Sequence, residues 1–85
     1  MSDSIEIDAT DVWPEDADDV DEGMVATWFA REGGGVDEGE TICEIQVEKV
    51  SVDVPAPVSG TLEEILVGEN EEFDRGDALG RIDSD

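Results

Sequence analysis

The sequence predicts an all-β fold, either a barrel or a sandwich, and three observations support that prediction. Short segments rich in β-branched and other apolar residues alternate with turns that contain glycine, proline or asparagine. No stretch shows the apolar periodicity of an amphipathic helix. The chain also repeats itself internally, as described below. The segments that we expect to form strands are residues 5–7, 24–30, 42–47, 50–54, 62–67 and 79–82.

The first half of the chain contains one long interruption of this strand pattern. Residues 5–7 alternate apolar and acidic side chains, as a half-exposed strand does. Residues 8–22 are rich in acids and include Trp13 before a proline, which predicts an exposed acidic loop. Trp13 either contacts a partner or packs back on the barrel. In the next strand, Trp28 and Phe29 are expected in the core.

An internal repeat relates two parts of the chain at a spacing of 37 residues. Residues 23–45 align with residues 60–82 without a gap, and apolar residues match at six further positions: Val25/Leu62, Trp28/Ile65, Phe29/Leu66, Ala30/Val67, Val36/Phe73 and Ile42/Leu79. Two copies of one β-unit predict a pseudo-twofold axis, with the apolar faces of the two units packed together. The identical pairs are Gly23/Gly60, Glu32/Glu69, Asp37/Asp74, Gly39/Gly76 and Ile45/Ile82.

The charge balance is strongly acidic and excludes several classes of partner. The 85 residues include 26 Asp and Glu against 4 Lys and Arg, for a formal net charge of −22. Nucleic acids and anionic membrane surfaces are bound by clustered cations, so neither is an expected partner. The acids are interleaved with apolar residues, which favours a folded protein adapted to a salty, halophilic cytoplasm over a disordered tail.

The length and the cysteine content set further limits. Residues 1–85 are enough for a single small domain, and we expect a monomer. Cys43 is alone and histidine is absent, so the sequence offers neither a disulfide nor a thiolate metal site; a buried, inert Cys43 is expected. The N-terminus has no basic and apolar signal pattern, which predicts a cytoplasmic protein.

Lys49 is the only lysine in the chain, and it lies between the two repeat copies. Strand pattern continues on both sides of Glu48 and Lys49, which places the lysine at or near the tip of a β-hairpin. An amine there projects into solvent, within reach of a modifying enzyme. Taken alone, the lysine is better explained as a solvated surface charge among acidic neighbours.

These residues resemble the lipoyl domains of 2-oxo acid dehydrogenase complexes and, more broadly, the biotinyl/lipoyl attachment family. The resemblance implies a flattened barrel of two four-stranded antiparallel sheets, with the modified lysine on an exposed hairpin. The matching residues are Glu22-Gly23, Trp28, Glu32-Gly33, Val36, Gly39-Glu40, Glu44-Ile45, Glu48-Lys49 and the run from Val54 to Gly60.

The neighbours of the lysine favour lipoate over biotin. Biotin carriers of this family have methionine on both sides of the lysine, whereas Lys49 has Glu48 and Val50. Lipoyl domains typically have an acid before the lysine, which Glu48 matches, and a small residue after it, from which Val50 departs. The resemblance makes these two residues the recognition hairpin. The enlarged 8–22 loop is a second departure, in a segment that helps family members choose partners.

The resemblance also implies partners and a cycle. A lipoylating enzyme joins lipoate to Lys49, and the arm then serves a thiamine-dependent decarboxylase, an acyltransferase and a flavoprotein dihydrolipoyl dehydrogenase. The protein would be a free-standing carrier that catalyses nothing itself, because the cofactor supplies the chemistry. Two alternatives remain: a biotin carrier subunit of a carboxylase, and an unmodified structural or interaction barrel.

Overall fold

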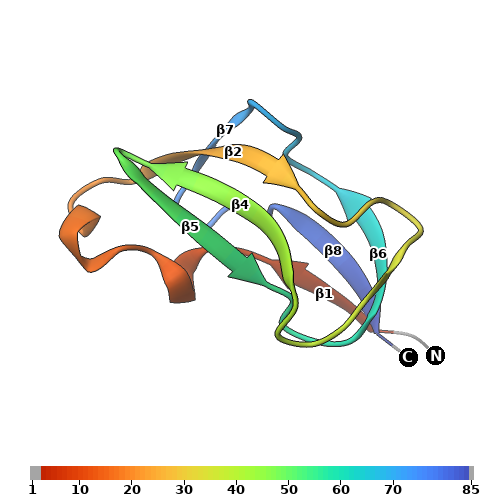
Figure 1. Ribbon diagram of the computed structural model, residues 1–85. Coiled ribbons are helices and arrows are strands. Elements are labelled where there is room, and N and C mark those ends of the chain that lie inside the picture. The colour runs from red at the N-terminus through yellow and green to blue at the C-terminus, as the bar shows by residue number, and fades with distance from the viewer. Residues whose placement is uncertain (1–2, 85) are drawn as a thin grey trace.

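The computed structural model describes residues 3–84 and consists of eight strands and two short 3-10 helices (Figure 1). The strands are β1 Asp3–Ile7, β2 Glu22–Trp28, β3 Gly35–Val36, β4 Thr41–Val47, β5 Val50–Pro55, β6 Gly60–Ile65, β7 Glu72–Asp74 and β8 Gly80–Ser84. The 3-10 helices are η1 Thr10–Val12 and η2 Glu15–Ala17. The all-β prediction is confirmed. The sequence missed β3 and β7, because two or three residues are too few to display an alternating pattern.

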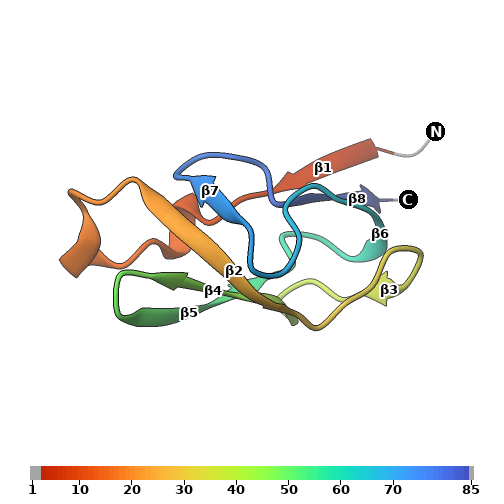
Figure 2. The same cartoon turned by 90° about the horizontal axis from the view of Figure 1, so that it is seen from above.

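The strands form two antiparallel sheets of four, which face each other as layers of a flattened barrel (Figure 2). One sheet has the order β1-β8-β6-β3, and the other has the order β5-β4-β2-β7. The molecule is elongated, with principal extents of 39 × 20 × 18 Å. Within residues 3–84, no helix is long and apolar enough to cross a membrane.

The core lies between the sheets and follows from strand alternation. In β4, Ile45 and Val47 are fully buried while Gln46 between them is exposed, because successive side chains point to opposite faces. Leu62 of β6 and Ile82 of β8, in the other sheet, belong to the same core cluster and are also fully buried. Complete burial of such a side chain stabilises the fold by roughly 1.5–3 kcal/mol.

The internal repeat is present in three dimensions as a repeat of strand register. In one half, Val25 of β2 pairs with Ile45 of β4. In the other half, Leu62 of β6 pairs with Ile82 of β8, which is the same pair 37 residues later. A β-bulge also recurs, between Val25 and Thr27 in β2 and between Leu62 and Glu64 in β6. The two sheets therefore have equivalent strand orders, with β5, β4, β2 and β7 matching β1, β8, β6 and β3.

The acidic 8–22 segment differs from the exposed loop that the sequence predicts. Its carboxylates are exposed, but Ala9, Trp13 and Ala17 are buried in the same core as the strands. The 3-10 turns η1 and η2 produce this division, since a short helical turn directs neighbouring side chains to different sides. Of the two alternatives for Trp13, the structure shows the packed one.

Phe29 is a further correction to the expected core. Its side chain is 61% exposed, whereas Trp28 before it packs against the core. The N–H groups of Phe29 and Ala30 both donate to the carbonyl of Ile42, at 2.8 and 3.3 Å. Two residues thus oppose one at the end of β2, and because Trp28 points inward there, alternation turns its neighbour Phe29 outward.

Candidate functional site

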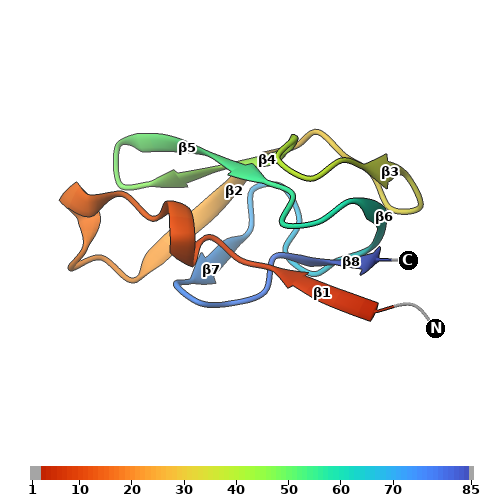
Figure 3. The same ribbon diagram turned by 90° about the horizontal axis from the view of Figure 1, so that it is seen from below.

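The hairpin between β4 and β5 holds the residues that the sequence singled out. Val47 pairs with Val50, so Glu48 and Lys49 form a two-residue turn. Glu48, Lys49 and Val50 are all exposed at its tip. The tip projects from the end of the barrel opposite to the one where β1 begins and β8 ends (Figures 1 and 3). The structure therefore brings the three predicted site residues together on one protruding surface.

The backbone of the turn is unusual at Glu48. Its φ is +56°, while Lys49 is not in the left-handed region. Positive φ at only the first of two turn residues is the sign pattern of a type II′ hairpin turn. The left-handed region costs a residue with a Cβ about 1 kcal/mol. The side-chain amide of Gln46 donates to the carbonyl of Glu48 at 3.4 Å, which supports this conformation.

A rigid base supports the exposed tip. The register of β4 and β5 is continuous from Glu44↔Asp53 to Val47↔Val50. Ile45, Val47 and Val54 from these two strands are buried in the core. The hairpin is therefore anchored along its length by strand pairing and by buried side chains.

Among the described residues, Lys49 takes part in neither of the two side-chain ion pairs. These pairs join Arg75 to Asp18 and Arg81 to Glu64. The amine of Lys49 is thus exposed and is held by no carboxylate of residues 3–84, as acylation by an external enzyme requires. An exposed primary amine at the tip of an anchored hairpin fits the covalent amide attachment of an acid cofactor.

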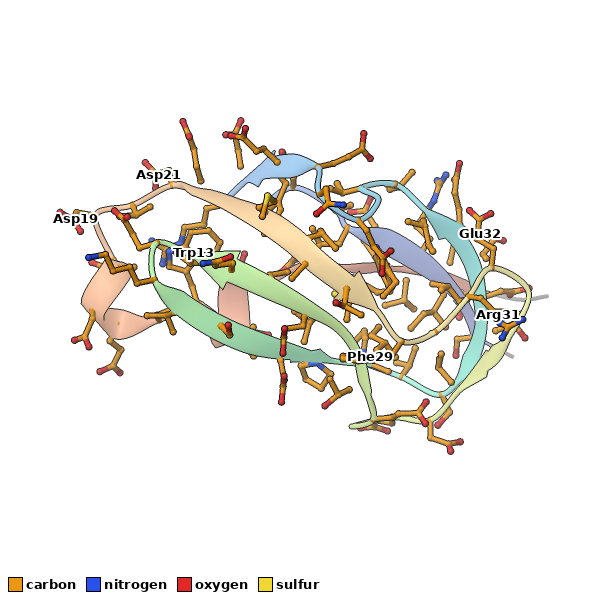
Figure 4. The ribbon with its side chains drawn as sticks, turned by 45° about the horizontal axis from the view of Figure 1, so that its top comes forward. Trp13, Asp19, Asp21, Phe29, Arg31 and Glu32 are labelled. Atoms are coloured by element: carbon orange, nitrogen blue, oxygen red, sulfur yellow. The ribbon has the colours of Figure 1, made fainter. Side chains whose placement is uncertain are left out.

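The acidic segment 8–21 is held against the same end of the barrel by Trp13 (Figure 4). The indole N–H of Trp13 lies 3.0 Å from the carbonyls of Ala17 and of Val20 and donates to both. The ring meets Phe73 edge-on, with centroids 6.2 Å apart and planes at 85°. The sequence signal was a tryptophan in an acidic segment, but nothing in the sequence identified its partners.

Arg75 secures this segment from the outside. Its guanidinium carbon lies 5.5 Å from the centroid of the Trp13 ring, within cation–π distance. It also donates to the carbonyl of Asp18 at 3.0 Å and approaches the Asp18 carboxylate at 3.5 Å. The shape of the surface beside the lysine hairpin therefore depends on residues from both ends of the chain.

A groove of about 320 Å³ opens beside the hairpin on the outer face of the β5-β4-β2-β7 sheet. We call it the outer groove; its lining residues are Val20, Glu22, Gly23, Met24, Gln46, Glu48 and Glu72. The sequence did not identify this site. One residue could have indicated the groove. Met24 is apolar although it lies at an outward position of β2, where a polar residue is usual.

Cys43 is buried, as expected from the sequence. Burial raises the pKa of its thiol to about 12, because desolvation disfavours the thiolate. The thiol is therefore neutral and enclosed at ordinary pH, and it has no role at the hairpin.

Comparison with known proteins agrees with the fold. Residues 12–82 match the Biotin_lipoyl family, described as biotin-requiring enzyme. The chain is similar to the dihydrolipoyllysine-residue acetyltransferase component of the pyruvate dehydrogenase complex, with 37% identity over 71 residues in Staphylococcus epidermidis and 35% in Staphylococcus aureus. These matches cover 84% of this chain but 16% of the relatives.

A solved structure matches over nearly the whole chain. The lipoyl domain of the 2-oxoglutarate dehydrogenase complex from Azotobacter vinelandii is 30% identical, with a TM-score of 0.68, and the match covers 93% of this chain and 92% of that one. The fold and the lysine hairpin together define a carrier domain for a covalently attached cofactor. The chain belongs to the biotin/lipoyl attachment family, and within that family its similarity is to lipoyl domains.

Proposed function

We propose that this protein carries lipoate as an amide on Lys49 and presents it to the enzymes of a 2-oxo acid dehydrogenase-type complex. The observation that supports this most directly is the position of Lys49. The only lysine of the chain lies exposed, outside any ion pair of the described residues, at the tip of an anchored hairpin in a lipoyl-domain fold.

The chain's own residues position the amine and then present the arm. Amide formation removes the charge of Lys49 and leaves a neutral arm at the end of β4 and β5. The anchored hairpin keeps the attachment point fixed while the side chain rotates. Tethering of this kind raises the local concentration at a docked active site to the order of millimolar. The attached cofactor supplies acyl and electron transfer, and the protein itself is a non-catalytic carrier.

The proposed partners come from the relatives. Their printed names place them in pyruvate and 2-oxoglutarate dehydrogenase complexes. We extend this to a thiamine-dependent decarboxylase, an acyltransferase and a flavoprotein dihydrolipoyl dehydrogenase, besides the enzyme that attaches lipoate. Glu48 and Val50 flank Lys49 on the exposed turn, so we assign them to recognition by the attaching enzyme.

The charge of the chain extends the proposal to its solution conditions. Of the carboxylates that the structure describes, Asp18 and Glu64 are the two in side-chain ion pairs. The rest repel one another, and about 1 M salt reduces the range of that repulsion to roughly 3 Å. We propose that the fold is adapted to high salt. Circular dichroism across a salt series tests this, since full native structure without salt would contradict it.

Intact mass measurement of protein from its native host tests the carrier function. A lipoyl increment on the peptide that contains Lys49 is the expected result. A biotin increment would show that the carried cofactor is biotin and not lipoate. Uniformly unmodified protein in cells with other lipoylated proteins would overturn both carrier functions. Two variants act as controls. Lys49→Arg should lose all labelling with unchanged melting. Val50→Ala keeps the amine and installs the small residue that typically follows the lysine in lipoyl domains, so it should still be labelled.

A further inference from the structure

The outer groove has an apolar floor and an acidic rim. Met24 of β2 pairs directly with Gln46 of β4 on one side and with Glu72 of β7 on the other, so the three side chains form a row across the outer face of the sheet. Val20 and the half-buried Met24 provide its apolar surface. The rim carries the carboxylates of Glu22, Glu48 and Glu72, of which Glu48 precedes the lysine.

The other half of the repeat provides an internal comparison for this groove. Strands β6 and β8 have the same register, but Thr61 and Asp83 occupy the positions of Met24 and Gln46. Thr61 is exposed and polar, as an outward strand position usually is. The fold therefore does not require a large apolar residue there. Met24 occurs only in the half whose strand β4 leads to the lysine.

The groove lies within reach of an arm on Lys49. The row of Met24 and Gln46 lies about 10 Å along the strand from the tip and one strand spacing, about 5 Å, across. A lipoyl-lysine side chain extends on the order of 14 Å from its Cα, from bond lengths of about 1.5 Å. The terminal ring can therefore reach the groove without movement of the hairpin.

We propose that the outer groove is a resting dock for the neutral dithiolane end of the lipoyl arm on Lys49. This inference rests on the proposed function. The ring is apolar and contains sulfur, and the thioether of Met24 is a soft, polarisable partner for it. The carboxylates of the rim stay hydrated, so the ring packs on the apolar floor of the groove. The groove is shallow and open on the solvent side, so the docked state exchanges with a free one and a partner enzyme can withdraw the arm.

Nuclear magnetic resonance of the lipoylated protein tests the dock in high salt. Loading is first verified by the mass of the Lys49 peptide. We expect amide shift changes between unmodified and loaded protein at Glu22, Met24, Gln46 and Glu72, and nuclear Overhauser effects between the ring protons and the Met24 methyl group. Shift changes confined to residues 48–50 would overturn the dock.

Three variants give a second readout, which is the rate at which dithiothreitol reduces the oxidised arm. Thiol–disulfide exchange depends on access, so docking slows it. Met24→Thr installs the residue found at the equivalent position, Thr61, and should raise the rate by about threefold or more. Met24→Leu keeps an apolar floor and should stay near wild type. Thr61→Met, on the opposite sheet, is the matched control and should change nothing. Equal rates in wild type and Met24→Thr would contradict the proposal.

Failure of the dock and failure of the carrier function give different results. If the lipoylating enzyme does not label Lys49, the carrier function fails. Acylation of the same amine with an activated lipoate ester still produces the amide, so the shift and rate measurements decide the dock separately. If labelling succeeds but the ring contacts are absent, the dock alone is wrong.

Discussion

The two halves of the barrel share their hydrogen bonding and differ in what their strands lead to. Strand β4 continues into the lysine hairpin, whereas its equivalent β8 runs to the last described residues. In each half, a glutamate side chain accepts a hydrogen bond from a backbone N–H group of the other half. The carboxylate of Glu32 accepts from the N–H of Ile65 at 2.8 Å, and that of Glu69 accepts from the N–H of Trp28 at 2.9 Å.

The comparison separates residues that the fold requires from those that serve the hairpin end. Gly33 donates to the carbonyl of Leu62 and Asn70 donates to that of Val25, and both donors have positive φ, at 86° and 68°. Such paired features belong to the scaffold. Features with no counterpart lie at the end that presents Lys49; they are Met24 and the packing of Trp13 against Phe73 and Arg75.

The largest expected effect comes from Trp13, which belongs to neither repeat copy. Trp13→Ala should lower the free energy of unfolding by about 3–5 kcal/mol, because a large buried ring and two indole hydrogen bonds are lost. Trp13→Phe keeps a ring and should cost about 1–2 kcal/mol. Denaturant unfolding at fixed salt measures both. Unchanged stability in Trp13→Ala would show that the acidic segment is not part of the core.

The next largest effect should distinguish two equivalent glycines, Gly60 and Gly23, which tolerate an added methyl group to different degrees. A methyl group at Gly60 would overlap the backbone carbonyl of Asp83, which cannot yield, so Gly60→Ala should cost about 3 kcal/mol. A methyl group at Gly23 would lie 2.9 Å from the ring of Phe73, which can shift, and 3.4 Å from the carbonyl of Gln46. Gly23→Ala should therefore cost about 1 kcal/mol. Thermal melting compares the two, and a larger loss at Gly23 would reverse the argument.

Glu32 and Glu69 occupy equivalent positions in the two halves, so substitutions at the two residues should have equal effects on stability. Glu32→Ala and Glu69→Ala each remove one acceptor from a backbone N–H, and each should cost about 1 kcal/mol. Urea unfolding at a fixed high salt concentration measures them. A cost confined to one of the two variants would mean that the halves are not energetically equivalent.

The smallest expected effect is a loss of stability at alkaline pH that comes from Cys43. It is confined to one half of the barrel, since the residue equivalent to Cys43 is Gly80. Burial raises the pKa of Cys43 from an ordinary 9.0 to about 12. The unfolded thiol therefore releases its proton first, so the contribution is complete below pH 9 and is lost as the pH rises toward 12. At pH 9.5 the loss should be less than about 1 kcal/mol. A Cys43→Ala variant should lack this slope, and a slope that persists would assign it elsewhere.

Most of the scaffold and the exposed lysine hairpin could be predicted from sequence. Ile45 and Ile82 face inward because strand alternation has a period of two and the repeat doubles the signal. Lys49 was identified from its place between the two copies. Phe29 was misassigned because Trp28 and Phe29 are both large and aromatic, and only the structure shows which of these two neighbours points inward.

The sequence by itself determined the fold class, the pseudo-symmetry and the lysine, because these follow from local periodicity and from a repeat within one chain. Only the tertiary structure decided what surrounds the lysine. Trp13, Phe73 and Arg75 meet across about 60 residues of chain, and the outer groove joins β2, β4 and β7. Such contacts depend on long-range strand pairing and packing, and their partners are fixed only when the sheets close on each other.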